Sequence, residues 1–314
     1  MARKLIVDCD PGIDDAVALC MALFDPRLDV VAVTATGGNV PGDQASRNVQ
    51  ALIERLDPLR YPRIGIVSSP KVTPHVDARF IHGDDGLGNQ ALDVSLHHHR
   101  HAADKVIIDE VRAAPHEVTL LCLGPLTNVA RAFQRDPELP NLVDHLVIMG
   151  GSVCGIGNIT PTAEFNIYAD PISAQQVFQS RTTKTLVPLD ITTQIKFTLD
   201  FKVDLPLETS RAGKLLHPMI NFVFRSYHQH MGQESIHLHD AVALVAVVNP
   251  ELFQSTDMFG QVETRGQLTS GMTVFDRRSE SHASPNMEVV TEVDVMAVTN
   301  CIVRGLAHAG RLTS

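Results

Sequence analysis

Four carboxylates fall within eight residues near the amino terminus. Asp8 and Asp10 end a short apolar run, and Asp14 and Asp15 follow at the start of a helical pattern. Carboxylates this close repel one another, so something must compensate for their charge. A helix N-terminus stabilises a negative charge by about 0.3–1 kcal/mol, which suits Asp14 as a cap but does not explain Asp8 and Asp10. We favour a hard cation such as Ca²⁺ or Mg²⁺, which takes oxygen ligands, over solvated carboxylates.

A second copy of this helix start occurs late in the chain. The residues Asp-Ala-Val-Ala-Leu run from Asp15 to Leu19 and again from Asp240 to Leu244. Both patterns are apolar all round, which predicts buried helices, and an X-Pro step follows each of them. Chance is one explanation, because Ala, Val and Leu are common in buried helices. The other is that each helix aims one carboxylate at a shared cation, with His239 beside it as a candidate acid or base.

Short apolar runs alternate with helical patterns along the chain, and these elements must position the carboxylates. Most runs lack a strict alternation, which is typical of strands buried on both faces of a parallel sheet. One helix is predicted over Asp43–Leu56, and another begins at Asp170-Pro171. The pattern predicts an α/β fold with an open, mostly parallel sheet flanked by helices. No linker divides the chain, so we expect a single domain over residues 1–314. The predicted strands are Lys4–Val7, Val30–Thr34, Arg63–Val67, Val118–Leu123, His145–Met149 and Thr185–Leu189.

Polar side chains follow the predicted strands, where ligands bind in open α/β sheets. They include Asn39, Asn128, Asn158, Glu164 and Asn166, with almost no Lys or Arg among them. A phosphate site would normally recruit cations or a Gly-rich loop with Lys. The residue types instead suit an uncharged ligand rich in hydroxyl groups, often held together with a hard cation.

Composition excludes several functional classes. The chain has 314 residues, 44% of them hydrophobic, and a formal net charge of −10. The apolar fraction argues against a disordered or fibrous protein, and the acidic balance argues against nucleic-acid binding. No stretch reaches transmembrane length, so we expect no membrane association. The five cysteines form no Cys-x-x-Cys pair, which favours reduced thiols and a cytoplasmic protein.

The ordered set of motifs resembles the calcium-dependent nucleoside hydrolases, the inosine-uridine preferring family. The acidic stretch from Asp8 to Ala16 resembles the amino-terminal fingerprint of that family, and the similarity covers nearly the whole chain. It implies a Rossmann-like α/β fold with the active site at the carboxyl ends of the strands. The further motifs are Thr36-Gly37-Gly38-Asn39, His82-Gly83, Gly86-Leu87-Gly88, Gly124-Pro125-Leu126-Thr127-Asn128, Met149-Gly150-Gly151, Asn158, Thr160-Pro161, Glu164-Phe165-Asn166, Asp170-Pro171, His239-Asp240-Ala241, Val262-Glu263-Thr264 and Pro285-Asn286.

The resemblance implies hydrolysis of the N-glycosidic bond of ribonucleosides to ribose and a free base. Asp10, Asp15, Asp240 and the backbone carbonyl of Leu123 would ligate Ca²⁺, and Asp10 would also be the general base. Such cleavage passes through an oxocarbenium-like sugar, which surrounding carboxylates and carboxamides stabilise. The residues implied to bind substrate are Asp14, Asn39, His82, Asn158, Glu164, Phe165, Asn166, Tyr227 and Gln229.

The leaving base gains negative charge and needs a proton, for which His239 is the candidate donor. Members of the family that stack purines on tryptophan activate the leaving group differently, and this chain has no Trp. The absence favours the pyrimidine-preferring or broad inosine/uridine type. The resemblance also implies a homodimer or homotetramer.

Some segments leave alternatives open. Asp84 and Asp85 add charge to the His82 loop, and His237 is expected to point away from the site if residues 237–239 are extended. The segment Phe222–His230 offers Arg225, Tyr227, Gln229 and His230 toward the base or forms an ordinary amphipathic helix. The histidine cluster His97–His101 is expected to be a solvated segment.

Three other functions fit parts of the sequence. A Mg²⁺-dependent aspartyl-phosphate phosphatase also places Asp-x-Asp after its first strand, but here Pro11 and Gly12 follow and no suitable lysine stands at a later strand end. A non-catalytic protein that binds nucleoside or Ca²⁺ would keep the ligands without turnover, which the presence of Asp10 and His239 disfavours. A structural Ca²⁺ site in another α/β enzyme is disfavoured by the polar residues over 158–166.

Overall fold

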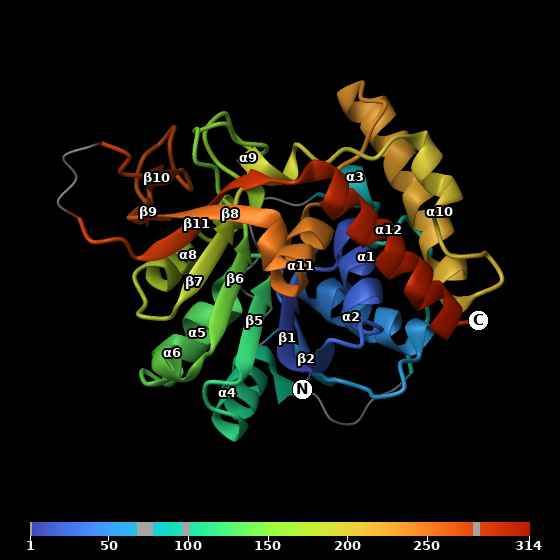
Figure 1. Ribbon diagram of the computed structural model, residues 1–314, viewed down its shortest axis with the longest axis horizontal. Helices are drawn as coiled ribbons and strands as arrows, with labels where there is room; N and C mark the ends of the chain where they lie inside the picture. Colours follow the sequence, from blue (N-terminus) through green and yellow to red (C-terminus); the bar gives the residue numbers. More distant parts are fainter. Residues whose placement is uncertain (1, 68–77, 96–100, 279–282) are drawn as a thin grey trace.

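A mostly parallel sheet runs through the middle of the protein (Figure 1). The computed structural model describes residues 2–67, 78–95, 101–278 and 283–314. Within those ranges nine strands pair in the order β4-β3-β2-β1-β5-β6-β7-β11-β8, and β8 alone runs antiparallel to its neighbour. A separate antiparallel pair is formed by β9 (Gly260–Val262) and β10 (Thr273–Phe275). The sheet strands are β1 Arg3–Cys9, β2 Leu28–Ala35, β3 Arg63–Ile66, β4 His101–Ala102, β5 Val118–Cys122, β6 His145–Met149, β7 Lys184–Val187, β8 Phe253–Met258 and β11 Met287–Val293.

All six predicted strands are present in this sheet, with ends shifted by at most two residues. The sequence did not predict β4 or any strand after β7. β4 has only two residues, and four consecutive residues of β8, Gln254 to Asp257, are exposed, so neither forms an apolar run. Of the histidine cluster, His101 begins β4 and is exposed, while residues 97–100 lie outside the described ranges.

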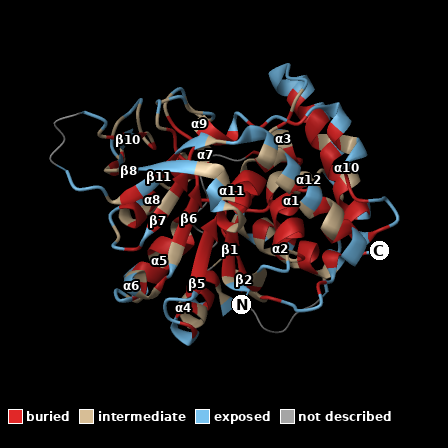
Figure 2. Ribbon diagram, viewed as in Figure 1, coloured by how far each residue is buried: buried red, intermediate tan, exposed pale blue. Residues whose placement is uncertain are grey.

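Helices cover both faces of the sheet, with α1, α2, α10, α11 and α12 on one face and α4, α5, α6 and α8 on the other (Figures 1 and 2). A π-helical turn, Tyr227–Met231, continues α10, and Leu199–Val203 and Pro250–Leu252 form short 3₁₀ turns. The predicted start of α8 is confirmed, because Asp170 caps it by accepting a hydrogen bond from the Ser173 N–H at 3.0 Å. The α-helices are α1 Ile13–Ala22, α2 Gly42–Leu56, α3 Arg79–His82, α4 Ala103–Ala113, α5 Thr127–Arg135, α6 Leu139–Leu142, α7 Phe165–Ala169, α8 Pro171–Phe178, α9 Leu189–Thr192, α10 Arg211–Ser226, α11 His239–Val248 and α12 Val295–Leu312.

Two hydrophobic cores, one on each face, explain why the strands read as apolar runs. In β1, Leu5 and Val7 pack into the core under α1, while Ile6 between them packs into the opposite core. In β5, Leu121 packs into the core under α1 and Leu120 packs into the opposite core. Successive side chains of a strand point to opposite faces, so a strand covered on both sides must be apolar at every position.

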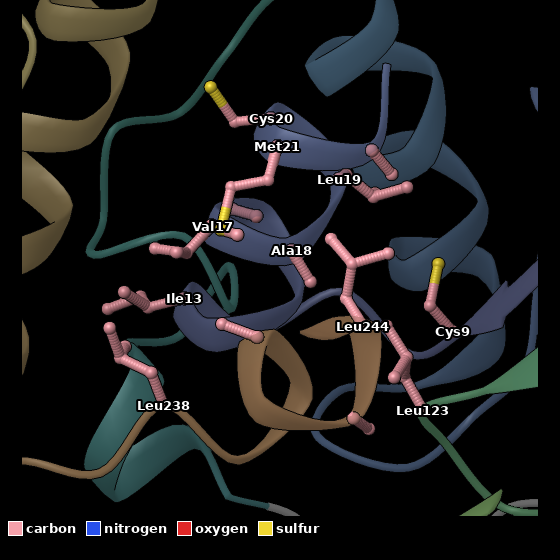
Figure 3. Close-up of a cluster of buried hydrophobic side chains, with 14 of the residues drawn as sticks. Cys9, Ile13, Val17, Ala18, Leu19, Cys20, Met21, Leu123, Leu238 and Leu244 are labelled. Atoms are coloured by element: carbon pink, nitrogen blue, oxygen red, sulfur yellow. The ribbon is translucent and has the colours of Figure 1, made fainter. Parts of the chain in front are cut away.

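The two similar helices, α1 and α11, pack directly against each other. Figure 3 shows Ala18 of α1 and Leu244 of α11 next to one another in a cluster of buried apolar side chains. α1 starts at Ile13, two residues earlier than predicted, and Gly12 takes the cap position that the sequence suggested for Asp14. The predicted helix pair is therefore confirmed, and the amino ends of both helices lie at the same edge of the sheet.

Candidate active site

A cavity of about 240 Å³ opens beyond the carboxyl ends of the central strands. One part of its wall consists of polar side chains that follow β1, β2 and β6, together with Asp240 of α11. The rest is mostly apolar and comes from α3, α10, the π-helical turn and the residues that begin α1 and α11. The polar side chains of the first part are Asp14, Asn39, Asn158, Glu164, Asn166 and Asp240, and the apolar and aromatic ones of the rest include Ile13, Phe80, Ile81, Val223, Tyr227, Met231 and Leu238. Five further polar residues, His82, Thr193, Gln233, His237 and His239, also line the cavity.

Three carboxylates meet at the base of this cavity. One oxygen each from Asp14, Asp15 and Asp240 lies within 4.8 Å of the other two. Two ligands about 2.4 Å from one Ca²⁺ ion can be at most about 4.8 Å apart, so this spacing is compatible with a shared cation. The amino ends of α1 and α11 supply all three: the repeated sequence suggested Asp15 and Asp240, and Asp14 joins them.

Asp10 lies beside this group without being one of its three members. Its Oδ2 accepts a hydrogen bond from the Asn39 N–H at 2.6 Å, and its buried Oδ1 has no partner among the described residues. A Cβ atom built on Gly38 would lie 1.9 Å from Oδ2, and one on Gly124 would lie 2.5 Å from Oδ1. Both positions therefore need glycine because the backbone approaches Asp10 too closely for a side chain.

The carboxylates are poorly compensated by the protein alone. Burial raises the pKa of Asp10, Asp15 and Asp240 well above the usual range, and repulsion among these groups and Asp14 raises it further. Buried oxygens of Asp14 and Asp15 also lack hydrogen-bond partners within the described chain. Buried unpaired carboxylates are costly, and a cation would both neutralise them and occupy the free oxygens. The residues present therefore fit a bound divalent metal.

Asp8, the fourth carboxylate of the cluster, does not line the cavity. It is fully buried, and its Oδ1 accepts hydrogen bonds from the Thr34 hydroxyl at 2.5 Å and the Asn128 amide at 2.8 Å. These bonds join the ends of β1 and β2 to the start of α5. The backbone carbonyl of Asp8 also accepts from the Leu123 N–H at 2.8 Å, which fixes the start of the loop after β5.

The backbone carbonyl of Leu123 is the fourth ligand that the sequence suggested for the cation. Leu123 lines the cavity, and its carbonyl oxygen accepts a hydrogen bond from the Asn166 amide at 2.7 Å. A carbonyl oxygen has two lone pairs, so one remains for a second partner.

Glu164 and Asn166 are held in place by backbone groups. The Glu164 carboxylate accepts from the N–H groups of Gly151 at 3.0 Å, Asn166 at 2.9 Å and Ile167 at 3.1 Å, and it caps α7. Burial raises the pKa of Glu164 to about 7 although these bonds oppose the shift. Asn158 is exposed at the rim, where its side-chain oxygen accepts from the Phe165 N–H at 2.9 Å. Phe165, half-buried, also lines the cavity.

His82 and His239 both face the cavity. His82 Nδ1 accepts from the Ile13 N–H at 3.1 Å, so its proton lies on Nε2, which is 4.0 Å from Asp14 Oδ1. His239 Nδ1 shares a 2.7 Å hydrogen bond with the Thr192 hydroxyl. Burial, with the charges of His237 and His82, lowers the pKa of His239 to about 3. The free protein therefore keeps His239 neutral near pH 7.

The expectation for His237 is wrong, because this side chain also lines the cavity. Its ring stacks on His239 with centroids 5.3 Å apart and planes at 21°. Of the residues in 222–230, Val223 and Tyr227 line the cavity, whereas Arg225, Gln229 and His230 line a second depression, and Phe80 borders both. Gln229 is thus not placed against the cavity as the sequence suggested, since the π-helical turn directs it outward.

Sequence reasoning missed most of the apolar wall. Phe80, Ile81, Val223 and Met231 carry no chemical signature that separates them from core residues. An apolar pattern on a helix predicts that its residues are buried, but it does not tell whether they pack against the core or line a cavity.

No helix in the described ranges is both long and apolar enough to cross a lipid bilayer. All five cysteines are free, and Cys9, Cys20 and Cys122 are buried.

A mostly parallel sheet with buried carboxylates and carboxamides at its carboxyl edge is typical of α/β proteins that bind a ligand there. A family model described as inosine-uridine preferring nucleoside hydrolase matches residues 5–300. The chain belongs to this family, and it is a hydrolase that cleaves the N-glycosidic bond of ribonucleosides. The phosphatase alternative and the non-catalytic alternative are therefore both wrong.

Similar proteins cover essentially the whole chain. The non-specific ribonucleoside hydrolase RihC of Escherichia coli (strain SMS-3-5 / SECEC) is 37% identical over 98% of this chain and 100% of its own length. The structure of the plant nucleoside hydrolase PpNRh1 matches with a TM-score of 0.91 and 32% identity over 98% of this chain and 99% of that one. A purine-preferring ribonucleoside hydrolase from Gardnerella vaginalis matches with a TM-score of 0.90 and 29% identity, over 99% of this chain and 100% of that one.

Proposed function

We propose that this protein is a Ca²⁺-dependent ribonucleoside hydrolase that accepts uridine, cytidine and inosine, acting as one domain over residues 1–314. The observation that carries the proposal is the group of buried or half-buried carboxylates, with unpartnered oxygens on Asp14 and Asp15, at the base of a cavity otherwise lined by amides, histidines and apolar side chains. The group needs a cation, and among the described residues that line the cavity there is no Lys or Arg that would select a phosphate.

Asp10, Asp15, Asp240 and the Leu123 carbonyl would hold the ion. Oxygen ligands of this kind suit Ca²⁺. The closeness of Asp15 to Asp240 and the unpartnered Oδ1 atoms of Asp10 and Asp15 support this proposed set. Asp14, which also belongs to the group of three carboxylates, would lie beside the ion. When bound, the cation would neutralise the carboxylates and lower the pKa of a nearby water.

The polar wall would bind the ribose. Asp14, Asn39, Asn158, Glu164 and Asn166 offer oxygens and amides along the strand ends, and Phe165 would pack beside the sugar. Carboxylate and amide oxygens fixed by backbone hydrogen bonds favour the positive charge that develops on the sugar ring. Because Glu164 and Asn166 are already held in place, little reorganisation is needed when that charge develops.

Asp10 would accept the proton of the attacking water. Its Oδ2 is fixed by the Asn39 N–H, so Oδ1 is the oxygen left to receive a proton.

His239 would donate a proton to the leaving base. A pKa of about 3 does not support a stored imidazolium. The negative charge that develops on the departing base would raise this pKa, so His239 would take up a proton from solvent water as the bond breaks and pass it to the base. His82, which presents an Nε2–H, and the Tyr227 hydroxyl would contact the base.

The base preference would be broad or toward pyrimidines. The chain has no Trp, so the wall that includes Ile81, Val223 and Tyr227 offers packing against a base without an indole ring to stack on. The similar proteins carry differing descriptions, non-specific for RihC and purine-preferring for the Gardnerella enzyme, so they leave this choice open.

We further propose a cytoplasmic homodimer or homotetramer. Five free thiols are typical of a reducing compartment. Light scattering on the purified protein would measure the oligomeric state.

A nucleoside assay with controlled calcium tests the proposal. Uridine, cytidine, inosine and adenosine are supplied to protein stripped with a chelator and then titrated with CaCl₂ or MgCl₂. We expect loss of hydrolysis on stripping and recovery with Ca²⁺ at lower concentration than with Mg²⁺. Full activity in the stripped protein would refute the cation requirement, and no cleavage in saturating Ca²⁺ would refute the substrate assignment.

A further inference from the structure

His237 has one ring nitrogen tied to the backbone and the other left for the cavity. Nδ1 lies 3.1 Å from the carbonyl oxygen of Ile195. A carbonyl can only accept, so Nδ1 carries the proton and Nε2 carries a lone pair. The side chain is half-buried and lines the cavity. Nε2 is on the opposite side of the ring from the bond to Ile195, so it is an acceptor available to a ligand.

The backbone fixes the opposite tautomer in His82. There Nδ1 accepts from the Ile13 N–H, which leaves Nε2–H as a donor. The two histidines therefore present one fixed donor and one fixed acceptor to the same cavity. His82 cannot become an acceptor at Nε2 without losing its backbone hydrogen bond, and His237 is an acceptor at Nε2 as long as its ring is neutral, which burial favours by lowering its pKa.

The neighbours of His237 place it near the candidate leaving-group acid. Its ring lies over His239 at a centroid distance of 5.3 Å and beside Tyr227 at 6.4 Å. A base close enough to receive a proton from His239 would lie within reach of His237. A neutral acceptor at this point would meet the edge of the base and not the ribose, whose polar contacts come from the strand ends.

We propose that His237 is a specificity-determining residue, whose Nε2 accepts a hydrogen bond from the ring N–H of a base that carries this N–H beside a carbonyl. Uracil and hypoxanthine have that group, whereas cytosine and adenine present a ring nitrogen lone pair in its place. Two lone pairs facing each other leave both buried acceptors unpaired, which is how a polar site rejects a wrong ligand. The inference rests on the proposed function and adds the choice between base types.

The test compares kcat/KM for two matched substrate pairs, uridine against cytidine and inosine against adenosine. His237→Phe keeps a flat ring to stack on His239 but removes the acceptor. His237→Gln can donate to Ile195 and still present a carbonyl oxygen. His217→Phe is the control, because His217 also bonds a backbone carbonyl, Pro206 at 2.8 Å, but does not line the cavity.

We expect wild type and His217→Phe to prefer uridine over cytidine and inosine over adenosine. His237→Phe should reduce each ratio by roughly 10- to 100-fold, and His237→Gln should restore part of it. Unchanged ratios would overturn the inference while leaving the hydrolase function intact. Equal loss for all four substrates would also overturn it, because His237 would then only support His239. If wild type with Ca²⁺ cleaves none of them, the proposed function fails as well.

Discussion

The backbone N–H of Asn39 holds Oδ2 of Asp10 at 2.6 Å, and the Asn39 side chain reaches Oδ2 of Asp15 at 3.3 Å. Asn39, in the loop that follows β2, thus orients two carboxylates: Asp10 in the loop after β1 and Asp15 in α1. The arrangement leaves Oδ1 of Asp10 and Oδ1 of Asp15 without hydrogen-bond partners among the described residues.

Asp10→Asn should lower kcat by about 10²- to 10⁴-fold with a much smaller change in KM. The Asn carbonyl can still accept from Asn39, so the side chain keeps its place but cannot take up a proton. Steady-state kinetics with uridine measures both constants. A change confined to KM would mean that Asp10 serves binding and not chemistry. Calcium titration followed by thermal shift shows whether the variant also binds the ion less tightly.

Gly38→Ala should remove most activity because the new Cβ would lie 1.9 Å from Oδ2 of Asp10 and force that side chain to move. We expect kcat/KM to fall by at least roughly 100-fold, since misplaced catalytic groups are costly. Gly305→Ala is the matched control, because its nearest atom is the flexible end of Met21 at 3.0 Å. Wild-type kinetics in Gly38→Ala would contradict the placement of Asp10.

His239→Ala should slow uridine hydrolysis far more than hydrolysis of nitrophenyl riboside. Uracil is a poor leaving group that needs a proton, whereas nitrophenolate leaves without one. We expect a loss of about 10²- to 10⁴-fold for uridine and less than about 10-fold for the nitrophenyl substrate. Equal losses for the two would remove His239 as the acid and leave it a structural role beside Thr192.

Glu164→Gln should change how stability depends on pH. Burial raises the pKa of Glu164 to about 7 from a usual 4.5, so the folded protein holds this proton more tightly than the unfolded chain. The resulting contribution to stability is complete below pH 4.5 and is lost as pH rises through 7.

The melting temperature of Glu164→Gln relative to wild type should therefore rise between pH 4.5 and 7 and then level off. Thermal unfolding of both proteins in chelator at several pH values measures this difference. A constant difference across the range would mean that Glu164 titrates normally, with its charge satisfied by the backbone bonds to Gly151, Asn166 and Ile167.

Local sequence was sufficient for the central strands, α1, α11 and the acidic loop. A strand covered on both faces must be apolar throughout, and a helix apolar all round must be buried, so β1, β5 and α1 were recognisable from composition alone. The outer strands were not, because β8 lies at the sheet edge with exposed polar residues and β4 has two residues.

The sequence by itself determined the family, the α/β class and the chemical character of the site, because these depend on residue types in contiguous motifs such as Asp8–Asp15. Only the tertiary structure decided which side chains share the cavity. It turned Asp8 away, brought Asp14 to Asp15 and Asp240, directed Gln229 outward and stacked His237 on His239. Such choices depend on helix direction and on long-range backbone partners such as Ile195, which no local pattern encodes.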